Sequence, residues 1–242
     1  MLMNIDSRRL GRFQLRLLSA TDTAALKQLR AGVLAQLAHP DLYVREPDEG
    51  AFIRAHMGPH GEGSGETIGV FDGEDLVAYA MLGLPDANAP GNLGRHLPLP
   101  ARAMGGVAHI ASCMVREDCR GHGLQRLLLA ARFSLAQARG RVICIAMVSL
   151  HNQASRRNLM REGMRIGWVG DLDGLHRQLL VAHLTQPWEF DSDQVQLVER
   201  LDWARQGQLA REGWWGVSEL EGRGQNALVF ARRLAGTHSA TP

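Results

Sequence analysis

The segment CRGHGLQRLL, residues 119–128, combines residue types that could hold an anion. Gly121 and Gly123 flank His122, Arg120 precedes them, and a leucine-rich run follows. Glycines let a backbone turn with its N–H groups exposed, and the helix behind such a turn favours negative charge at its N-terminus. Arg120 would add a positive charge there. The spacing matches neither a Walker loop nor a dinucleotide fingerprint, so phosphate binding and a purely structural turn are equal alternatives for this segment alone.

A second segment with candidate functional residues is SLHNQASRRNLMREGM, residues 149–164. It follows a buried apolar strand, and Asn152 and Gly163 are typical residues for the start and the end of a helix. Asn152 in such a place is more often a helix cap than a ligand contact, with Ser155 in the first turn. Both roles are compatible, because the residue can cap the helix while its amide reaches a ligand.

Two residues are candidate general bases. His109 lies in the apolar segment 107–115, and under strict alternation it shares a face with Ala111 and Cys113. If that face lines a cleft, His109 could take a proton from an amine near neutral pH. The alternative is a core histidine that is hydrogen-bonded to the backbone. Glu66 is a second candidate, against the alternative of a solvated carboxylate at a strand end.

Taken together, the two segments resemble the GCN5-related N-acetyltransferase (GNAT) superfamily over roughly residues 12–185. The coenzyme A loop of that family has Arg or Gln, two residues, Gly, one residue, and Gly or Ala. Those places are taken here by Arg120, Gly123 and Gln125. The later family pattern is matched by Asn152, Ser155, Gly163 and Met164.

The resemblance implies an acetyl-coenzyme A (acetyl-CoA) site. The residues whose loop would hold the pyrophosphate are Arg120, Gly121, His122, Gly123, Leu124 and Gln125. The main chain of Cys113, Met114 and Val115 would pair with the pantetheine arm, and the backbone N–H at Cys113 would polarise the thioester carbonyl. Asn152 and Ser155 would contact the pantetheine or the thioester end.

This sequence departs from the family pattern at two positions. Gln125 replaces the small residue that usually ends the loop, and Leu159 stands where many members carry the tyrosine that protonates the departing thiolate. No general acid is therefore assigned.

The function implied is that of an acetyl-CoA-dependent N-acetyltransferase, which moves an acetyl group to a primary amine of a small molecule or peptide by direct attack in a ternary complex. A catalytically silent CoA-binding sensor or regulatory module is the alternative that Leu159 motivates. Transfer of a longer acyl chain is a third reading, for which an apolar lip around Met114 and the 85–106 connection would leave room. The acceptor itself cannot be named from the sequence.

The elements that must position these residues alternate between strands and helices. Apolar runs in the middle of the chain indicate a sheet that is covered on both faces, in an α/β domain with a mixed sheet. Helices are expected after residue 21, at 47–56, at 123–140 and at 152–163. Strands are expected at 12–18, 67–71, 76–84, 107–115, 141–150, 165–171 and 175–184. Residues 58–66 are a glycine-rich turn and 85–106 an irregular connection.

Residues 12–185 are expected to form the GNAT domain, and residues 186–242 a C-terminal helix-hairpin extension packed on it. A helix is predicted around 193–211, followed by a hairpin. The segments beginning REGMRIGWVG and REGWWGVSEL lie fifty residues apart, which indicates either a duplicated hairpin or a chance similarity. The tryptophans Trp188, Trp203, Trp214 and Trp215 would pack the extension, or line an acceptor pocket or a dimer face.

Composition excludes several other classes of protein. The net charge is +2 over 242 residues, so a broad basic face for nucleic acid is not supported. Apolar runs are too short to span a bilayer and no leader opens the chain, so we expect a cytoplasmic protein without membrane contact. The three cysteines are expected to be reduced thiols, no metal site is assigned, and a homodimer is compatible with the C-terminal unit.

Overall fold

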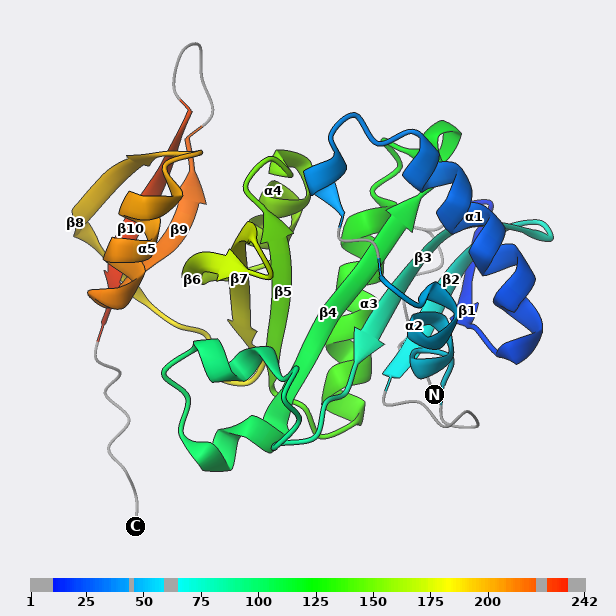
Figure 1. Cartoon of the computed structure of the whole chain (residues 1–242), viewed down its shortest axis with the longest axis horizontal. Coiled ribbons are helices and arrows are strands. Elements are labelled where there is room, and N and C mark those ends of the chain that lie inside the picture. Colours follow the sequence, from blue (N-terminus) through cyan, green and yellow to red (C-terminus); the bar gives the residue numbers. More distant parts are fainter. Residues whose placement is uncertain (1–10, 44–45, 59–64, 221–225, 235–242) are drawn as a thin grey trace. The chain divides into compact units, whose positions relative to one another are not determined.

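The computed structural model describes residues 11–43, 46–58, 65–220 and 226–234 (Figure 1). The chain divides into two compact units, Met1–Ile145 and Ala146–Pro242. The predicted glycine-rich turn falls largely on 59–64, outside the described residues. The division falls within a strand, and the predicted boundary near residue 185 stays a prediction.

The first unit is built on an antiparallel sheet of four strands in the order β1-β2-β3-β4. The strands are β1 (Phe13–Leu17), β2 (Gly65–Asp72), β3 (Asp75–Gly83) and β4 (Val107–Val115). The hairpin β2–β3 closes at Asp72↔Asp75 around Gly73, whose φ of 62° suits glycine. On its other side β4 pairs in parallel with β5 (Ile143–Ser149) over Val107–His109.

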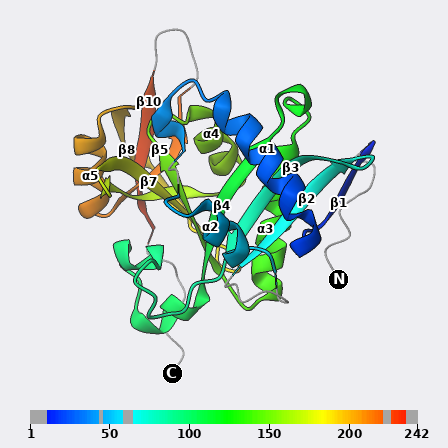
Figure 2. The same ribbon diagram turned by 45° about the vertical axis from the view of Figure 1, so that its right-hand side comes forward.

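Three helices accompany this sheet: α1 (Thr23–Ala35), α2 (Glu49–Ala55) and α3 (Leu124–Ala138). In Figures 1 and 2, α1 lies against one face of the strands and α3 against the other. The helical spacing expected for α1 is present, because Leu26, Leu29 and Val33 are buried in one core cluster with Tyr79 and Met81 of β3. Hence both faces of β3 are covered, and its burial is nearly complete.

The connection between β3 and β4 has no long helix or strand, as its prolines and glycines predict. It contains two short 3-10 turns, Leu93–His96 and Ala101–Gly106. Asn92 is 1% exposed, and its side chain donates to the carbonyls of Asp86 and Met104 and accepts from the N–H of Gly94. One buried amide therefore ties this connection together.

In the second unit the strand order is β7-β6-β9-β10-β8, and β5 crosses the boundary between the two units. The elements are α4 (Gln153–Arg161), β6 (Arg165–Leu172), β7 (Leu175–His183), β8 (Phe190–Glu199), α5 (Trp203–Arg211), β9 (Trp214–Glu219) and β10 (Ala227–Arg233). Two helices, each followed by a hairpin, thus make up most of this unit.

The two helix-hairpin segments repeat each other position by position. Asn152 and Asp202, fifty residues apart, each accept the N–H of the third residue after them, at 3.1 and 3.0 Å. The glycines that end the two helices have φ of 90° and 85°. The equivalent residues Ile166 of β6 and Gly216 of β9 face each other in an antiparallel pair. This pairing of equivalent positions gives the two segments a local twofold relation, and the duplication itself stays a prediction.

The predicted helix over 193–211 is wrong in its first half. Residues Phe190–Glu199 form β8, which pairs antiparallel with β10, and the helix begins only at Trp203. Most residues of the strand are exposed, including Leu197 at 61%, and Val198 is its one buried residue. This segment is a strand because β10 lies beside it and hydrogen-bonds its backbone, and this pairing outweighs the local helical propensity.

The aromatic residues of the second unit contact one another in small groups. Trp188 and Trp215 have ring centroids 4.6 Å apart, and Trp203 stacks on His176 at 3.9 Å. Arg232 lies 4.8 Å from the ring of Trp214. These contacts favour the packing role expected for the tryptophans. In the described part of the chain, no helix has both the length and the apolar character needed to cross a membrane.

Candidate functional site: the turn between β4 and α3

The glycine segment forms a tight turn between β4 and α3. After Val115 the chain makes one 3-10 turn, Glu117–Cys119, and α3 begins at Leu124. Gly121 and Gly123 have φ of 82° and 74°, and no other atom lies within 4 Å of a Cβ built on either. The conformation, rather than space, requires glycine at these two positions.

The turn presents its backbone to solvent. Gly121, His122, Gly123 and Arg120 are all exposed. Within the described residues of the first unit, no backbone hydrogen bond uses the N–H of Gly121, His122 or Gly123. These donors lie at the N-terminus of α3, where the helix dipole adds positive potential. The geometry therefore suits an anionic group at this turn.

His122 contributes to the turn itself. Its Nδ1 lies 3.2 Å from the carbonyl oxygen of Cys119 and 3.1 Å from that of Arg120, and its ring meets Phe13 edge-on at 5.6 Å. Leu124, 3% exposed, anchors the start of α3, and Gln125 follows it as a partly buried residue in the first helical turn.

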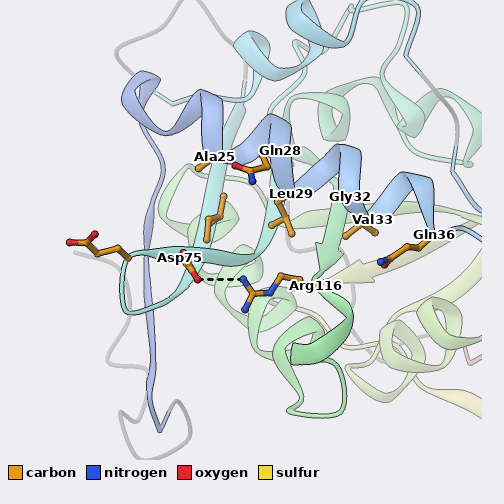
Figure 3. Close-up of a pocket in the computed structure, with 10 residues that line it drawn as sticks. Ala25, Gln28, Leu29, Gly32, Val33, Gln36, Asp75 and Arg116 are labelled. Atoms are coloured by element: carbon orange, nitrogen blue, oxygen red, sulfur yellow. Dashed lines mark ion pairs between the residues drawn. The ribbon is translucent and has the colours of Figure 1, made fainter.

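Arg116 ties the first part of the turn to its surroundings. Its Nε donates to Asp118 Oδ1 at 2.7 Å, and Nη1 lies 3.6 Å from Asp75 Oδ2. Figure 3 shows the Arg116–Asp75 pair beside α1, where Gln28 and Gln36 also border a pocket of about 350 Å³. The lining of the pocket combines apolar residues of α1 and β3 with a few polar groups.

A β-bulge interrupts β4 just before its end. Ile110 pairs with Leu82 and Cys113 with Ala80, so Ala111 and Ser112 together oppose Met81 alone. The bulge breaks the alternation along β4. Ala111 packs against the α1 core, whereas the Cys113 thiol interacts with Arg132 of α3.

The expectation that His109, Ala111 and Cys113 share one face is therefore wrong, since strict alternation holds only in an unbroken ladder. Met114 is 5% exposed within the α1 core, and transfer of a longer acyl chain stays a prediction.

Arg132 holds the bulge from the α3 side. It is 1% exposed, and its Nη1 donates to the carbonyls of Ala111 at 3.0 Å and Met81 at 3.4 Å. These are carbonyls of the two strands at the interrupted part of the ladder. A buried guanidinium thus satisfies backbone groups at the point where the regular pairing fails.

His109 makes a structural hydrogen bond. Its Nε2 lies 3.0 Å from the backbone N of Leu93 and accepts that N–H. Burial, together with nearby His56, lowers the pKa of His109 to about 4. The side chain is neutral at pH 7 and anchors the β3–β4 connection, which supports its alternative reading as a structural histidine. Its role as a base stays a prediction.

Glu66 is not a solvated carboxylate. It is 3% exposed, and both of its oxygens accept hydrogen bonds from Arg139 at 2.8 and 2.7 Å. This two-point ion pair joins β2 to the end of α3. It leaves neither oxygen of Glu66 without a structural partner.

The remaining predicted contacts lie in the second unit. Asn152 caps α4 by accepting the N–H of Ser155 at 3.1 Å. Leu159 is 4% exposed, so the helix presents an apolar core residue at that position. Arg156 is buried and forms a 3.0 Å ion pair with Glu219 of the repeat.

Sequence reasoning missed the buried polar cluster on the α1 face of β4. Arg30, 0% exposed, donates to Tyr79 and Ser112, and also to Glu49 and Tyr43. The only signal in the sequence is a serine inside an apolar strand. A single small polar residue of that kind is too common to have pointed to the cluster.

Comparisons with known proteins place these features in a family. The family model described as the acetyltransferase (GNAT) family matches residues 33–164, more than half of the chain. That range contains β4, the glycine turn and α4. A search of curated proteins finds no match.

Three of the solved structures with a similar fold are described below. NAA60 of Arabidopsis thaliana, in complex with acetyl-CoA, has a TM-score of 0.55 and 14% identity, covering 72% of this chain and 99% of that one. A probable acetyltransferase from Staphylococcus epidermidis has a TM-score of 0.53 and 14% sequence identity, covering 72% of this chain and 99% of that one. The putative acetyltransferase yncA from Salmonella typhimurium, with its cofactor acetyl-CoA, has a TM-score of 0.51 and 17% sequence identity, covering 74% of this chain and 98% of that one. By the family match and this shared fold, the chain belongs to the GNAT acetyltransferase family.

Proposed function

We propose that this protein is an N-acetyltransferase that moves the acetyl group of acetyl-CoA to a primary amine by direct attack in a ternary complex. The observation that carries the proposal is the exposed turn at the N-terminus of α3, where the N–H groups of Gly121, His122 and Gly123 form no backbone hydrogen bond among the described residues. The pyrophosphate of CoA would accept these N–H groups, and Arg120 would add charge. Two solved structures of similar fold were determined with acetyl-CoA, which supports this ligand.

The pantetheine arm would lie along β4. The parallel ladder with β5 ends at the pair His109↔Ile145, and β4 continues for six more residues. Cys113, Met114 and Val115 pair with β3 on one side. We propose that their other side pairs with the amide groups of the pantetheine, and that the N–H of Cys113 polarises the thioester carbonyl.

Direct attack is favoured over an acyl-cysteine intermediate. Burial raises the pKa of the Cys113 and Cys119 thiols, and raises that of Cys144 to about 12. All three cysteines are therefore protonated at neutral pH, and a thiol is a poor nucleophile. The rate enhancement would come chiefly from holding the amine and the thioester in attack geometry.

Two further assignments belong to the proposal. His109 remains a candidate base, although the Leu93 N–H occupies its Nε2, and a fully active His109→Ala variant would remove it from the mechanism. Asn152 and Ser155 of the second unit remain candidate CoA contacts.

The proposal is tested by the release of free thiol from acetyl-CoA in the presence of a panel of primary amines. The expected result is thiol release that depends on both the protein and one of the amines, with transfer of the acetyl group confirmed by mass. A folded protein that binds acetyl-CoA and releases no thiol with any amine would contradict the enzyme and favour the alternative below.

The alternative is a CoA-binding sensor or regulatory module without turnover. Leu159 favours it, because no group there can protonate a departing thiolate. A thiolate with a pKa near 8.5 is still a fair leaving group, so the enzyme does not require that acid.

A further inference from the structure

A closed triangle of hydrogen bonds lies beneath the bulge of β4. Arg30 Nη1 donates to Tyr79 Oη at 2.5 Å and to Ser112 Oγ at 3.0 Å, and Tyr79 Oη and Ser112 Oγ are 2.7 Å apart. Arg30 and Tyr79 are both 0% exposed, whereas Ser112 is partly exposed. The serine is therefore the only member of the triangle that a ligand can reach.

The donors in the triangle can be assigned by elimination. A guanidinium only donates, so both hydroxyl oxygens accept from Arg30. Among the described residues, the hydrogen-bond partners of the Tyr79 hydroxyl are Arg30 and Ser112, so its hydrogen has one acceptor, Ser112 Oγ. The reverse assignment would leave a buried phenol hydrogen without a partner, which is unfavourable. Burial also raises the pKa of Tyr79, which keeps that hydrogen in place at neutral pH.

It follows that Ser112 is a committed donor. Its two lone pairs are taken by Arg30 and Tyr79, so its own hydrogen points away from the cluster. Each bond in such a chain polarises the next, and the chain begins at a fixed positive charge. Ser112 is thus a poor nucleophile or base and a strengthened hydrogen-bond donor.

The position of Ser112 links this donor to the reaction. It lies in the bulge directly before Cys113, and three residues after His109, where the ladder with β5 ends. Arg132 fixes the same bulge from the other face through the carbonyl of Ala111. Both the serine hydroxyl and the backbone at this point of β4 are therefore held in place before any ligand arrives.

We infer that the Ser112 hydroxyl is a catalytic hydrogen-bond donor to the thioester carbonyl oxygen, and that Tyr79 and Arg30 are positioning residues behind it. This rests on the proposed function, which places the thioester beside Cys113. As the amine attacks, negative charge develops on that oxygen and the hydrogen bond strengthens. The proton stays on Ser112 Oγ throughout, and no covalent bond to the serine forms.

The direct test is infrared difference spectroscopy of acetyl-CoA labelled with carbon-13 at the thioester carbonyl. Bound to the wild-type protein, the carbonyl stretch should lie at lower wavenumber than in water; bound to Ser112→Ala it should move to higher wavenumber. Ser112→Thr keeps the hydroxyl and should restore the wild-type frequency. Tyr79→Phe should give a smaller upward shift, and none when added to Ser112→Ala.

The matched control is Ser134→Ala on α3, which removes another partly buried serine hydroxyl, bonded within its own helix to Ala130. It should leave the carbonyl frequency unchanged. With an amine identified from the panel, Ser112→Ala should lower kcat on the order of 10²-fold, the usual cost of one such donor, and should raise the dissociation constant for acetyl-CoA far less, because the hydrogen bond is strongest in the transition state.

The outcomes separate the two proposals. Equal carbonyl frequencies in wild-type protein and Ser112→Ala, with acetyl-CoA bound to both, would overturn this inference and leave the proposed function standing. A purely structural serine would lower the melting temperature of the variant without moving the carbonyl band, which counts against the inference in the same way. Failure of the wild-type protein to bind acetyl-CoA would overturn the proposed function and this inference with it.

Discussion

Gly123→Asp should abolish acetyl-CoA binding while the protein stays folded. The backbone of Gly123 is left-handed, and a Cβ there meets no other atom within 4 Å. The strain of a non-glycine residue is therefore about 1 kcal/mol. A carboxylate about 5 Å from one pyrophosphate charge costs about 3 kcal/mol at an effective dielectric constant of 20. Even this single pair corresponds to a rise of the dissociation constant by more than about 100-fold.

Calorimetric titration with acetyl-CoA measures this change, and Gly140→Asp is the matched control. Gly140 follows the other end of α3 with φ of 70°, and a Cβ there also meets nothing within 4 Å. Aspartate at that end opposes the helix dipole, so this variant should be at least as destabilised as Gly123→Asp. Binding should nevertheless be retained. Wild-type affinity in Gly123→Asp would refute the assignment of the turn to the pyrophosphate.

Three further predictions concern stability. The pKa of His109 is about 4 in the folded protein and near 6.5 in the unfolded chain, so the unfolded chain binds more protons between these pH values. The free energy of unfolding of the wild type should therefore fall by at most about 3 kcal/mol as the pH falls from about 6.5 to about 4. His109→Gln keeps an acceptor without titrating, so urea unfolding at pH 7 and pH 5 should show a smaller loss; an equal loss would contradict the shift. Glu66→Gln should lower the free energy of unfolding by about 1–3 kcal/mol, because Arg139 loses a charged two-point partner, and an unchanged urea midpoint would show that the pair contributes nothing. Glu219→Gln should lower the free energy of unfolding by about 3–5 kcal/mol by leaving the buried charge of Arg156 without its carboxylate partner, which thermal unfolding would detect as a clear fall in Tm.

Much of the fold could be predicted because local patterns agree with it. The spacing of Leu26, Leu29 and Val33 predicts α1, and the helix buries these residues. Asn152 and Gly163 predict the ends of α4, and both have the expected geometry. These features depend on residues a few positions apart, which a single sequence displays directly.

What could not be predicted depends on partners distant in the sequence. β8 is a strand because β10 lies beside it, and the sequence of residues 190–199 contains no signal for that pairing. The bulge in β4 depends on the register with β3, and it moves Cys113 off the face predicted for it. The partner of Glu66 is Arg139 at the end of α3, and the pattern of residues along β2 cannot predict which distant residue packs against Glu66.

The candidate site divides in the same way. The glycine turn could be located because its two left-handed positions, on either side of His122, require glycine, and the sequence shows both glycines directly. The cluster of Arg30, Tyr79 and Ser112 could not, since its members come from three elements and touch only in the folded chain. The role inferred for Ser112 depends on the hydrogen bond from Arg30, which the sequence does not show.

The measurement that tests the central claim most directly is a crystal structure of this protein with acetyl-CoA. We expect the pyrophosphate within hydrogen-bond distance of the N–H groups of Gly121 and Gly123, the pantetheine along Cys113–Val115, and the thioester carbonyl beside the N–H of Cys113. A complex with the pyrophosphate bound away from the turn, or with the arm elsewhere than along β4, would contradict it.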